Sequence, residues 1–186
     1  YYCNGVYHYG DRDYHCWNEF GHGEVDLSDA IKYSCNIYFY NAIQEFNLNE
    51  WAEMSNRFGF GMRTGIDLQN ESIGIIPTRE YMNKKYTSRG WAFGSLLNFV
   101  MGQGDILTTP IQVVQMMNLI VKGGTSGIPR LHKNKKIIPL TLNLNKDTWK
   151  FIQNALWRVV NEDNGTGNSA KILKNGVVSG KTGTAQ

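Results

Sequence analysis

The chain has 186 residues, and its content of 41% hydrophobic and 19% charged residues is typical of a globular protein rather than a disordered one. The formal net charge is +3 and no run of Lys or Arg exceeds two residues, which excludes the strongly basic surface of a nucleic-acid-binding protein. The sequence holds neither a signal peptide nor the stretch of about 18 apolar residues that predicts a transmembrane helix.

The N-terminal part combines an irregular start with three expected helices. Residues 1–23 mix glycines with aromatic residues without helical periodicity, which predicts an irregular, hairpin-like segment. Asp26 is a good N-cap for a first helix, and a second, well-buried helix is expected over residues 35–46. A third helix is expected from the cap Asn49 to about Phe58, where glycines end it.

The remaining chain predicts further helices and a final strand. The expected elements are a loop (62–76), a helix begun by Pro77 and Thr78 (77–86), an irregular glycine-containing stretch (87–108), a helix capped by Thr109 with Pro110 as its first residue, an exposed segment (125–145), a helix (148–160), a loop (164–167) and a strand (174–186). This order predicts an α+β fold with a helical subdomain over residues 24–160 and the first strand of a sheet.

Two short motifs carry the chemistry that the sequence predicts. Ser34-Cys35-Asn36 lies between two expected helices, and Lys181-Thr182-Gly183 lies on the expected strand. Taken singly, the first is also what a helix end followed by a new cap looks like, and the second resembles a glycine-rich edge strand. In this order, however, they match motifs that accompany a Ser-x-x-Lys nucleophile in serine acyl-transferases.

Ser34, Asn36 and Lys181 are the candidate catalytic residues. The Ser34 hydroxyl can relay a proton between a lysine and a leaving amine, as an acyl transfer requires. The Asn36 side chain offers both a donor and an acceptor to a peptide amide. Lys181 supplies a cation that shifts neighbouring pKa values and attracts a carboxylate.

Thr182, Gly183 and Thr184 are the candidate substrate-binding residues. Thr182 would add a hydroxyl for a substrate carboxylate. Gly183 would let the substrate backbone approach the strand edge and add like a further strand. The backbone N–H of Thr184 would face the developing oxyanion.

Cys3, Cys16, His22 and Cys35 form a candidate metal-binding set, which we call the Cys–His quartet. Three thiolates and one imidazole make a complete tetrahedral set for structural zinc. The spacing lacks a close Cys-x-x-Cys pair, so a Cys3–Cys16 disulfide or three unconnected thiols remain open from the sequence alone.

Several segments resemble the transpeptidase domain of the elongation-type class B penicillin-binding proteins, the penicillin-binding protein 2 group. They cover most of the chain in matching order: 21–27, 34–40, 58–61, 64–68, 74–80, 102–104, 109–112, 164–166 and 179–186. The elongation subtype rests on residues 17–27, and a division-type relative is the nearest competitor.

The resemblance implies a D,D-transpeptidase at the periplasmic face of the inner membrane, anchored by an N-terminal segment. It would cross-link D-Ala-D-Ala stem peptides of peptidoglycan through a serine acyl-enzyme and would be acylated by β-lactams. Its implied partners are a SEDS-type glycosyltransferase and proteins of the elongation complex, without nucleic acid and without a cofactor for catalysis. The fold implied is the penicillin-binding transpeptidase fold, in which a pedestal domain precedes the catalytic domain.

One feature departs from the family pattern: the chain contains no Ser-x-x-Lys sequence. The nearest approaches are Ser28 with Lys32, one residue too far, and Ser179 with Lys181, one residue too close. The chain also starts without Met and stops directly after a motif. We therefore expect a fragment whose nucleophile lies upstream and whose later strands lie downstream, and which is inactive by itself.

The resemblance also bears on the Cys–His quartet, because some elongation-type members carry a zinc site beside the second motif. The quartet falls at the matching places, and His8 and His15 are alternative imidazole ligands. Zinc here would be structural and would brace Ser34-Cys35-Asn36. The competing expectation is a Cys3–Cys16 disulfide, as periplasmic proteins allow.

Other members of the same fold give the alternative functions. A β-lactam sensor or another non-catalytic penicillin-binding domain shares these motifs and differs in its membrane segment. A class D-like β-lactamase would deacylate, but the long helical insert with Gly102-Gln103-Gly104 argues against that compact class.

Overall fold

The computed structural model describes all residues except 89, 93, 173–176 and 184–186. The chain divides into two compact units, one formed by residues 1–45 with 150–186 and the other by residues 46–149. We call them the first and the second unit and describe each separately. Within the described residues, no helix is both long and apolar enough to cross a membrane.

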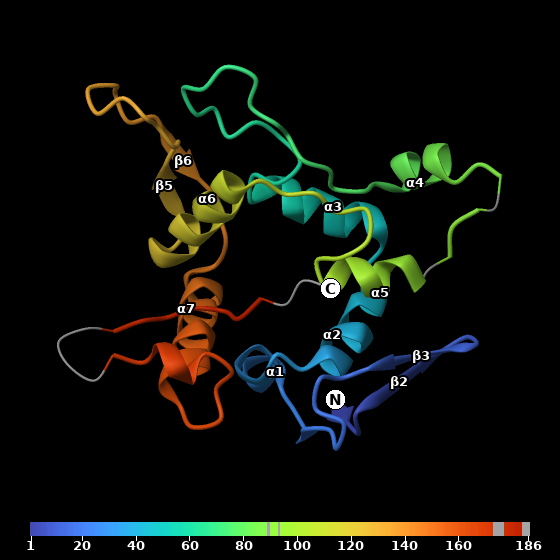
Figure 1. Ribbon diagram of the computed structural model, residues 1–186. Coiled ribbons are helices and arrows are strands. Elements are labelled where there is room, and N and C mark those ends of the chain that lie inside the picture. Colours follow the sequence, from blue (N-terminus) through green and yellow to red (C-terminus); the bar gives the residue numbers. More distant parts are fainter. Residues whose placement is uncertain (89, 93, 173–176, 184–186) are drawn as a thin grey trace. The chain divides into compact units, whose positions relative to one another are not determined.

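The first unit begins with short antiparallel strands. Its strands are β1 (Tyr2–Cys3), β2 (Val6–Tyr9), β3 (Arg12–His15) and β4 (Gly23–Glu24), with β1 paired to β4 and β2 paired to β3. The β2–β3 hairpin turns at Gly10, whose φ of 63° a glycine adopts without strain. The hairpin packs on α2, where Tyr40 contacts Tyr7 and Tyr14 with ring centroids 5.8 and 5.5 Å apart (Figure 1). The hairpin-like prediction for this segment is confirmed.

Helices of the first unit follow from local capping. Its helical elements are α1 (Leu27–Tyr33), α2 (Asn36–Ala42), the 3-10 turn η1 (Ile43–Glu45), the larger part of α7 (Lys146–Asn161) and the 3-10 turn η2 (Asn168–Ala170). The predicted cap Asp26 is confirmed, because its carboxylate accepts a 2.7 Å hydrogen bond from the Asp29 N–H. The helix predicted over residues 35–46 is α2, which tightens into η1 at its end.

The predicted strand that carries Lys181 is not formed in its described part, residues 177–183. Instead, the Gly180 N–H donates to the Leu156 carbonyl over 3.1 Å, and the Asn161 amide donates to the Val178 carbonyl over 2.8 Å. Both bonds tie this segment to α7 rather than to a neighbouring strand. A strand is defined by its ladder of bonds to another strand, so an extended, β-like sequence alone does not make one. Residues 174–176 and 184–186 of the predicted strand lie outside the described part of the chain.

The second unit is mainly helical. Its elements are α3 (Leu48–Arg57), α4 (Arg79–Lys85), α5 (Gly94–Val100), α6 (Pro110–Val121), β5 (Thr125–Gly127), β6 (Pro139–Thr141) and the first turn of α7 (Figure 1). The predicted cap Thr109 is confirmed, because its side chain accepts a hydrogen bond from the Gln112 N–H. The helix expected to begin at Pro77 begins two residues later, and Thr78 is its cap, accepting from the Tyr81 N–H. The irregular structure predicted over residues 87–108 is wrong for α5, and the exposed segment predicted over 125–145 contains the paired strands β5 and β6.

The predicted cap of α3 was placed two residues late. Asn47 caps α3, with its side chain accepting 3.0 Å bonds from the N–H groups of Asn49 and Glu50. The Glu50 carboxylate in turn accepts a hydrogen bond from the Asn47 N–H, which completes a capping box. Asn49 instead accepts a 2.9 Å bond from the Arg79 N–H, which ties α3 to the start of α4. The sequence offers two asparagines, and the glutamate three residues after Asn47 is the local signal that marks it as the cap.

Gly124 gives a prediction about the core of the second unit. Its φ is 97°, and a Cβ there would lie 2.6 Å from the Leu142 carbonyl oxygen and 2.8 Å from the Trp149 ring. Gly123 has a φ of 65° but open space around a Cβ. We expect Gly123→Ala to cost about 1 kcal/mol of unfolding free energy through backbone strain alone. Gly124→Ala should cost about 2 kcal/mol more through the added clash. Equal midpoints in chemical denaturation of the two variants would contradict the packing around Gly124.

Candidate active site

The two sequence motifs meet in the first unit through Ser34 and Lys181. The Lys181 ammonium donates a hydrogen bond to the Ser34 hydroxyl, although the residues are 147 positions apart. Lys181 also contacts the Thr182 carbonyl and hydroxyl oxygens at 3.2 and 3.3 Å. The Thr182 hydroxyl lies 3.2 Å from the Ser34 hydroxyl. The structure therefore brings together three of the residues that the sequence predicts for the site.

Thr166 completes the group, and no role was predicted for it. Its hydroxyl lies 3.2 Å from the Ser34 hydroxyl and 2.9 Å from the Thr182 hydroxyl. It also lies 3.3 Å from the Lys32 carbonyl. We call Ser34, Thr166, Lys181 and Thr182 the hydroxyl–lysine cluster. The only sequence signal for Thr166 was its place in the short segment 164–166 of the family resemblance.

The backbone of Ser34 holds an unusual conformation for a residue with a side chain. Ser34 is the C-cap of α1, with φ 53° and ψ 46° in the left-handed region. Glycine is the usual residue there, and a serine costs about 1 kcal/mol more. The following N–H, that of Cys35, bonds to the Ala30 carbonyl over 3.0 Å and closes the helix end. Ser34 thus projects its hydroxyl from a sharp turn between α1 and α2, as strained functional positions often do.

The ammonium of Lys181 is partly removed from water, although the residue as a whole is exposed. This desolvation lowers the pKa of Lys181, because a charged group is less stable away from water. A lysine with a lowered pKa gives up its proton more readily than a free lysine does. Protonated Lys181 is therefore a better proton donor to Ser34 than an ordinary lysine.

The remaining predicted site residues are Asn36, Gly183 and Thr184, and they are not members of the hydroxyl–lysine cluster. The Asn36 amide donates to the His15 carbonyl over 3.0 Å, and among the described residues no hydrogen bond joins it to the hydroxyl–lysine cluster. Gly183 is exposed, with open space where a Cβ would be, which leaves room for a ligand backbone. Thr184 lies outside the described residues.

A network of ion pairs joins α1, the helix that ends at Ser34, to α7. The Lys32 ammonium is 2.9 Å from the Glu162 carboxylate, and Arg158 is 3.0 Å from the same carboxylate oxygen. Arg158 also donates to the Ser28 hydroxyl over 2.6 Å and to the Asp29 carboxylate over 2.7 Å. The hydrogen bond from Lys32 lowers the pKa of Glu162. This network, which we call the α1–α7 clamp, ties both the first and the last turn of α1 to the C-terminal end of α7.

The Cys–His quartet comes together in the first unit. Its ligand atoms all lie within 4.8 Å of one another, and its three cysteines are buried and free. His22 Nδ1 lies 3.6 Å from the sulfurs of both Cys3 and Cys16. The alternative ligands His8 and His15 do not belong to this group, and His8 pairs with Asp13 instead.

The quartet fits a tetrahedral metal ion. Zinc bonds of about 2.3 Å to sulfur and about 2.0 Å to nitrogen place a sulfur and a nitrogen ligand about 3.6 Å apart at the tetrahedral angle. His22 Nδ1 lies at this distance from the sulfurs of Cys3 and Cys16. The hydrogen bond from Cys35 lowers the pKa of Cys16, and the same bond together with burial raises the pKa of Cys35. His22 stacks on Tyr33 with ring centroids 5.5 Å apart, which fixes the imidazole plane.

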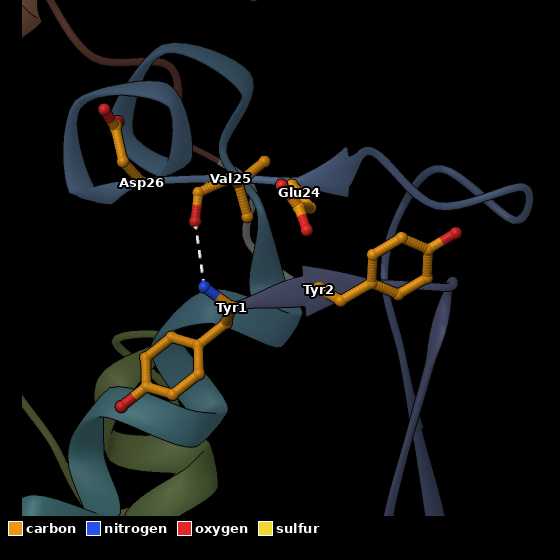
Figure 2. A pocket seen from close by; sticks show the side chains of 5 residues that line it. All are labelled: Tyr1, Tyr2, Glu24, Val25 and Asp26. Carbon is orange, nitrogen blue, oxygen red and sulfur yellow. Dashed lines mark hydrogen bonds between the residues drawn. The ribbon is translucent and has the colours of Figure 1, made fainter.

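A separate small pocket lies at the start of the chain (Figure 2). It is lined by Tyr1, Tyr2 and residues 24–26, and the Tyr1 ammonium donates to the Val25 carbonyl over 3.0 Å. No member of the hydroxyl–lysine cluster or of the quartet lines it.

Comparisons with known proteins show the family of the chain. The family described as "Penicillin binding protein transpeptidase domain" matches residues 1–186. The peptidoglycan D,D-transpeptidase MrdA of Haemophilus influenzae is 35% identical over 181 residues, which are 91% of this chain and 28% of that protein. The chain therefore spans less than a third of this relative.

Two solved structures superpose on the whole chain. The penicillin-binding protein PBP2 of Helicobacter pylori, in a complex with MreC, has a TM-score of 0.93 at 30% identity, and the chain covers 35% of it. PBP2 of Pseudomonas aeruginosa, in complex with WCK 5153, has a TM-score of 0.91 at 30% identity, and the chain covers 44% of it. The α+β fold expected from the sequence is confirmed by these matches.

Proposed function

The chain belongs to the family of penicillin-binding protein transpeptidase domains, and on this basis we propose that it is part of a peptidoglycan D,D-transpeptidase of cell elongation. The observation that carries the proposal is the contact between the Lys181 ammonium and the Ser34 hydroxyl. It joins the two motifs that accompany a Ser-x-x-Lys nucleophile in this class of enzyme. The chain itself has no such sequence, so the nucleophile would come from another part of the complete protein.

In the proposed reaction, the nucleophilic serine attacks the carbonyl carbon of the penultimate D-alanine and passes its own proton to the lysine of the Ser-x-x-Lys motif, which would lie outside this chain. The C–N bond to the terminal D-alanine breaks, and the leaving amine takes up one proton. Ser34 would give that proton while receiving another from Lys181, since Lys181 already donates to its hydroxyl. An amine of a second stem peptide then attacks the ester, forms the cross-link and releases the serine.

Thr182 and Gly183 would hold the substrate beside this relay. The Thr182 hydroxyl and the Lys181 ammonium are 3.3 Å apart and can bind one carboxylate together. The open space at Gly183 would admit the peptide backbone of the substrate or the ring of a β-lactam. Asn36 would enter the site only if its amide exchanges the His15 carbonyl for a substrate amide.

The setting of the complete protein follows from its relatives. We propose that it works at the periplasmic face of the inner membrane, held by a membrane anchor outside this chain. The H. pylori relative is seen in a complex with MreC, which supports a role in an elongation complex. A SEDS-type glycosyltransferase would supply the glycan strands that are cross-linked.

Product analysis of the complete protein tests the proposed function. We expect cross-linked dimers and free D-alanine from glycan strands with D-Ala-D-Ala stems, and we expect penicillin to abolish both. This chain alone should form neither product. Penicillin labelling of the complete protein without any cross-linking would overturn the synthase and favour a β-lactam sensor of the same fold.

We further propose that the Cys–His quartet holds a structural zinc ion. Three cysteines and one histidine with converging ligand atoms are the donor set of a closed zinc site. Cys35 lies between Ser34 and Asn36, so a metal bound there would stabilise the turn that presents Ser34. The metal would take no part in the acyl transfer.

Metal analysis gives a direct prediction for the quartet. The complete protein, purified without chelators, should hold about one zinc per chain. Cys35→Ser should lose the metal and lower the melting temperature by about 5 °C or more, because metal binding stabilises only the folded state. The matched variant His8→Gln, outside the quartet, should keep the zinc ion and the melting temperature of the wild type. Zinc-free protein with a Cys3–Cys16 disulfide, measured by mass after thiol alkylation, would overturn the metal site.

A further inference from the structure

We propose that Thr166 is a positioning residue that fixes the direction of the Ser34 hydroxyl. The proposal rests on the proposed acyl transfer and adds to it a residue outside both motifs. Thr166 touches Ser34, Thr182 and the Lys32 carbonyl, so its hydroxyl lies between the motif residues and the end of α1.

The donors and acceptors around Thr166 set the direction of the hydrogen bonds. Lys181 can only donate, and it donates to Ser34. The Lys32 carbonyl can only accept, so the single proton of Thr166 points to it. The two lone pairs of Thr166 are then left to accept protons from Ser34 and Thr182. We therefore assign the Ser34 proton to Thr166 rather than to the equally close Thr182 hydroxyl, and a Ser34 lone pair then faces Lys181.

The backbone of the loop holds Thr166 in this place. The Thr166 N–H also bonds to the Lys32 carbonyl over 3.3 Å, so two groups of one residue anchor it to the end of α1. The neighbouring Gly165 lies against α7, where a Cβ would come within 2.3 Å of the Val159 carbonyl oxygen. The Gly167 N–H bonds to that carbonyl over 3.0 Å. Thr166 is thus fixed from both sides, which keeps its hydroxyl from following Ser34 if Ser34 turns.

This arrangement matters for the relay. Ser34 must keep a lone pair toward Lys181 in order to receive a proton, and its own proton passes from its resting contact with Thr166 to the leaving amine when the substrate reacts. Without the acceptor at Thr166, the Ser34 proton can turn toward Thr182, which lies equally close at 3.2 Å. A fraction of the molecules would then hold Ser34 in a direction that does not support transfer. Loss of Thr166 should therefore slow acylation and leave ligand binding nearly unchanged.

Thr166→Val tests the proposal, because valine has nearly the same shape without a hydroxyl. In the complete protein we expect the rate constant of acylation by penicillin to fall about 10-fold, as the loss of one hydrogen bond predicts. The dissociation constant of the initial penicillin complex should stay within about twofold, and Thr166→Ser should restore the rate, as expected for a role of the hydroxyl group alone. Thr148→Val, the same change at an exposed position of α7, should leave the rate unchanged.

The outcomes separate this inference from the proposed function. Unchanged acylation in Thr166→Val would overturn the role of Thr166, while the transpeptidase would stand. A wild-type protein that is not acylated at all would instead overturn the proposed function. If Thr166→Val loses its cooperative thermal unfolding, Thr166→Ser decides: a rate well below wild type in a folded Thr166→Ser protein would contradict a role of the hydroxyl.

Discussion

Lys181→Met in the complete protein should lower the rate of acylation by penicillin by about 100- to 10,000-fold, the range that a positioned proton-transfer group contributes. The variant removes the ammonium that donates to Ser34 and contacts Thr182, while it keeps most of the volume of the side chain. The rate is measured with a fluorescent penicillin under single-turnover conditions. Lys150→Met, at an exposed position of α7 in the same unit, is the matched control and should react as the wild type does.

The dependence of this rate on pH gives a second readout for Lys181. Desolvation lowers its pKa, so the proton it gives to Ser34 is lost at a pH below the ordinary range of lysine. The acylation rate should fall on the alkaline side with a midpoint below about 10.4, the usual lysine value. Lys181→Arg should be about as slow as Lys181→Met and should lack this alkaline limb, because arginine stays charged and cannot give a proton to Ser34. An unchanged rate in Lys181→Met would show that the contact with Ser34 has no part in the chemistry.

Glu162→Gln should lower the free energy of unfolding by about 3 kcal/mol. The Lys32 side chain is only 9% exposed, so the loss of its carboxylate partner leaves a buried cation uncompensated. Arg158 loses the same partner but keeps Asp29. The partial exposure of Glu162 keeps the cost at the lower end of what broken buried pairs show. Glu45→Gln, an exposed change in the same unit, should cost little.

The pH dependence of the free energy of unfolding shows whether Glu162 stabilises the protein through its ion pairs or only through packing. The folded state lowers the pKa of Glu162, so its contribution to stability is fully present above the ordinary pKa of glutamate. That contribution is lost as the pH falls through the lowered pKa of the folded state. Glu162→Gln should therefore flatten the acid side of the stability curve, and wild type and variant should converge at low pH. A constant difference between them down to low pH would contradict the ion pair as the cause.

Local chemistry in the sequence was sufficient for several elements. Asp26 and Thr109 were placed correctly as caps because a short polar side chain at a helix start satisfies N–H groups two or three residues away. The helix α5 was missed because it starts at Gly94 in a stretch with several glycines, which favour loops. Its Leu96, Leu97 and Phe99 are buried, so tertiary packing decides its structure.

The site was predictable only where motifs repeat a known pattern. Ser34, Lys181 and Thr182 were placed from their motifs, and the structure brings their side chains together. Thr166 belongs to no motif, and its contact with Ser34 spans 132 residues, so no local rule connects them. The predicted strand at Lys181 failed for a related reason, since pairing depends on a partner elsewhere in the chain.

Peptide mapping of the complete protein after reaction with penicillin tests the central claim most directly. The account predicts one covalent adduct, on a serine that is followed three residues later by a lysine and lies outside these 186 residues. It also predicts that Lys181→Met forms the same adduct far more slowly. An adduct on Ser34 would contradict the role of Ser34 as a relay, and the absence of any adduct would contradict the acyl-enzyme itself.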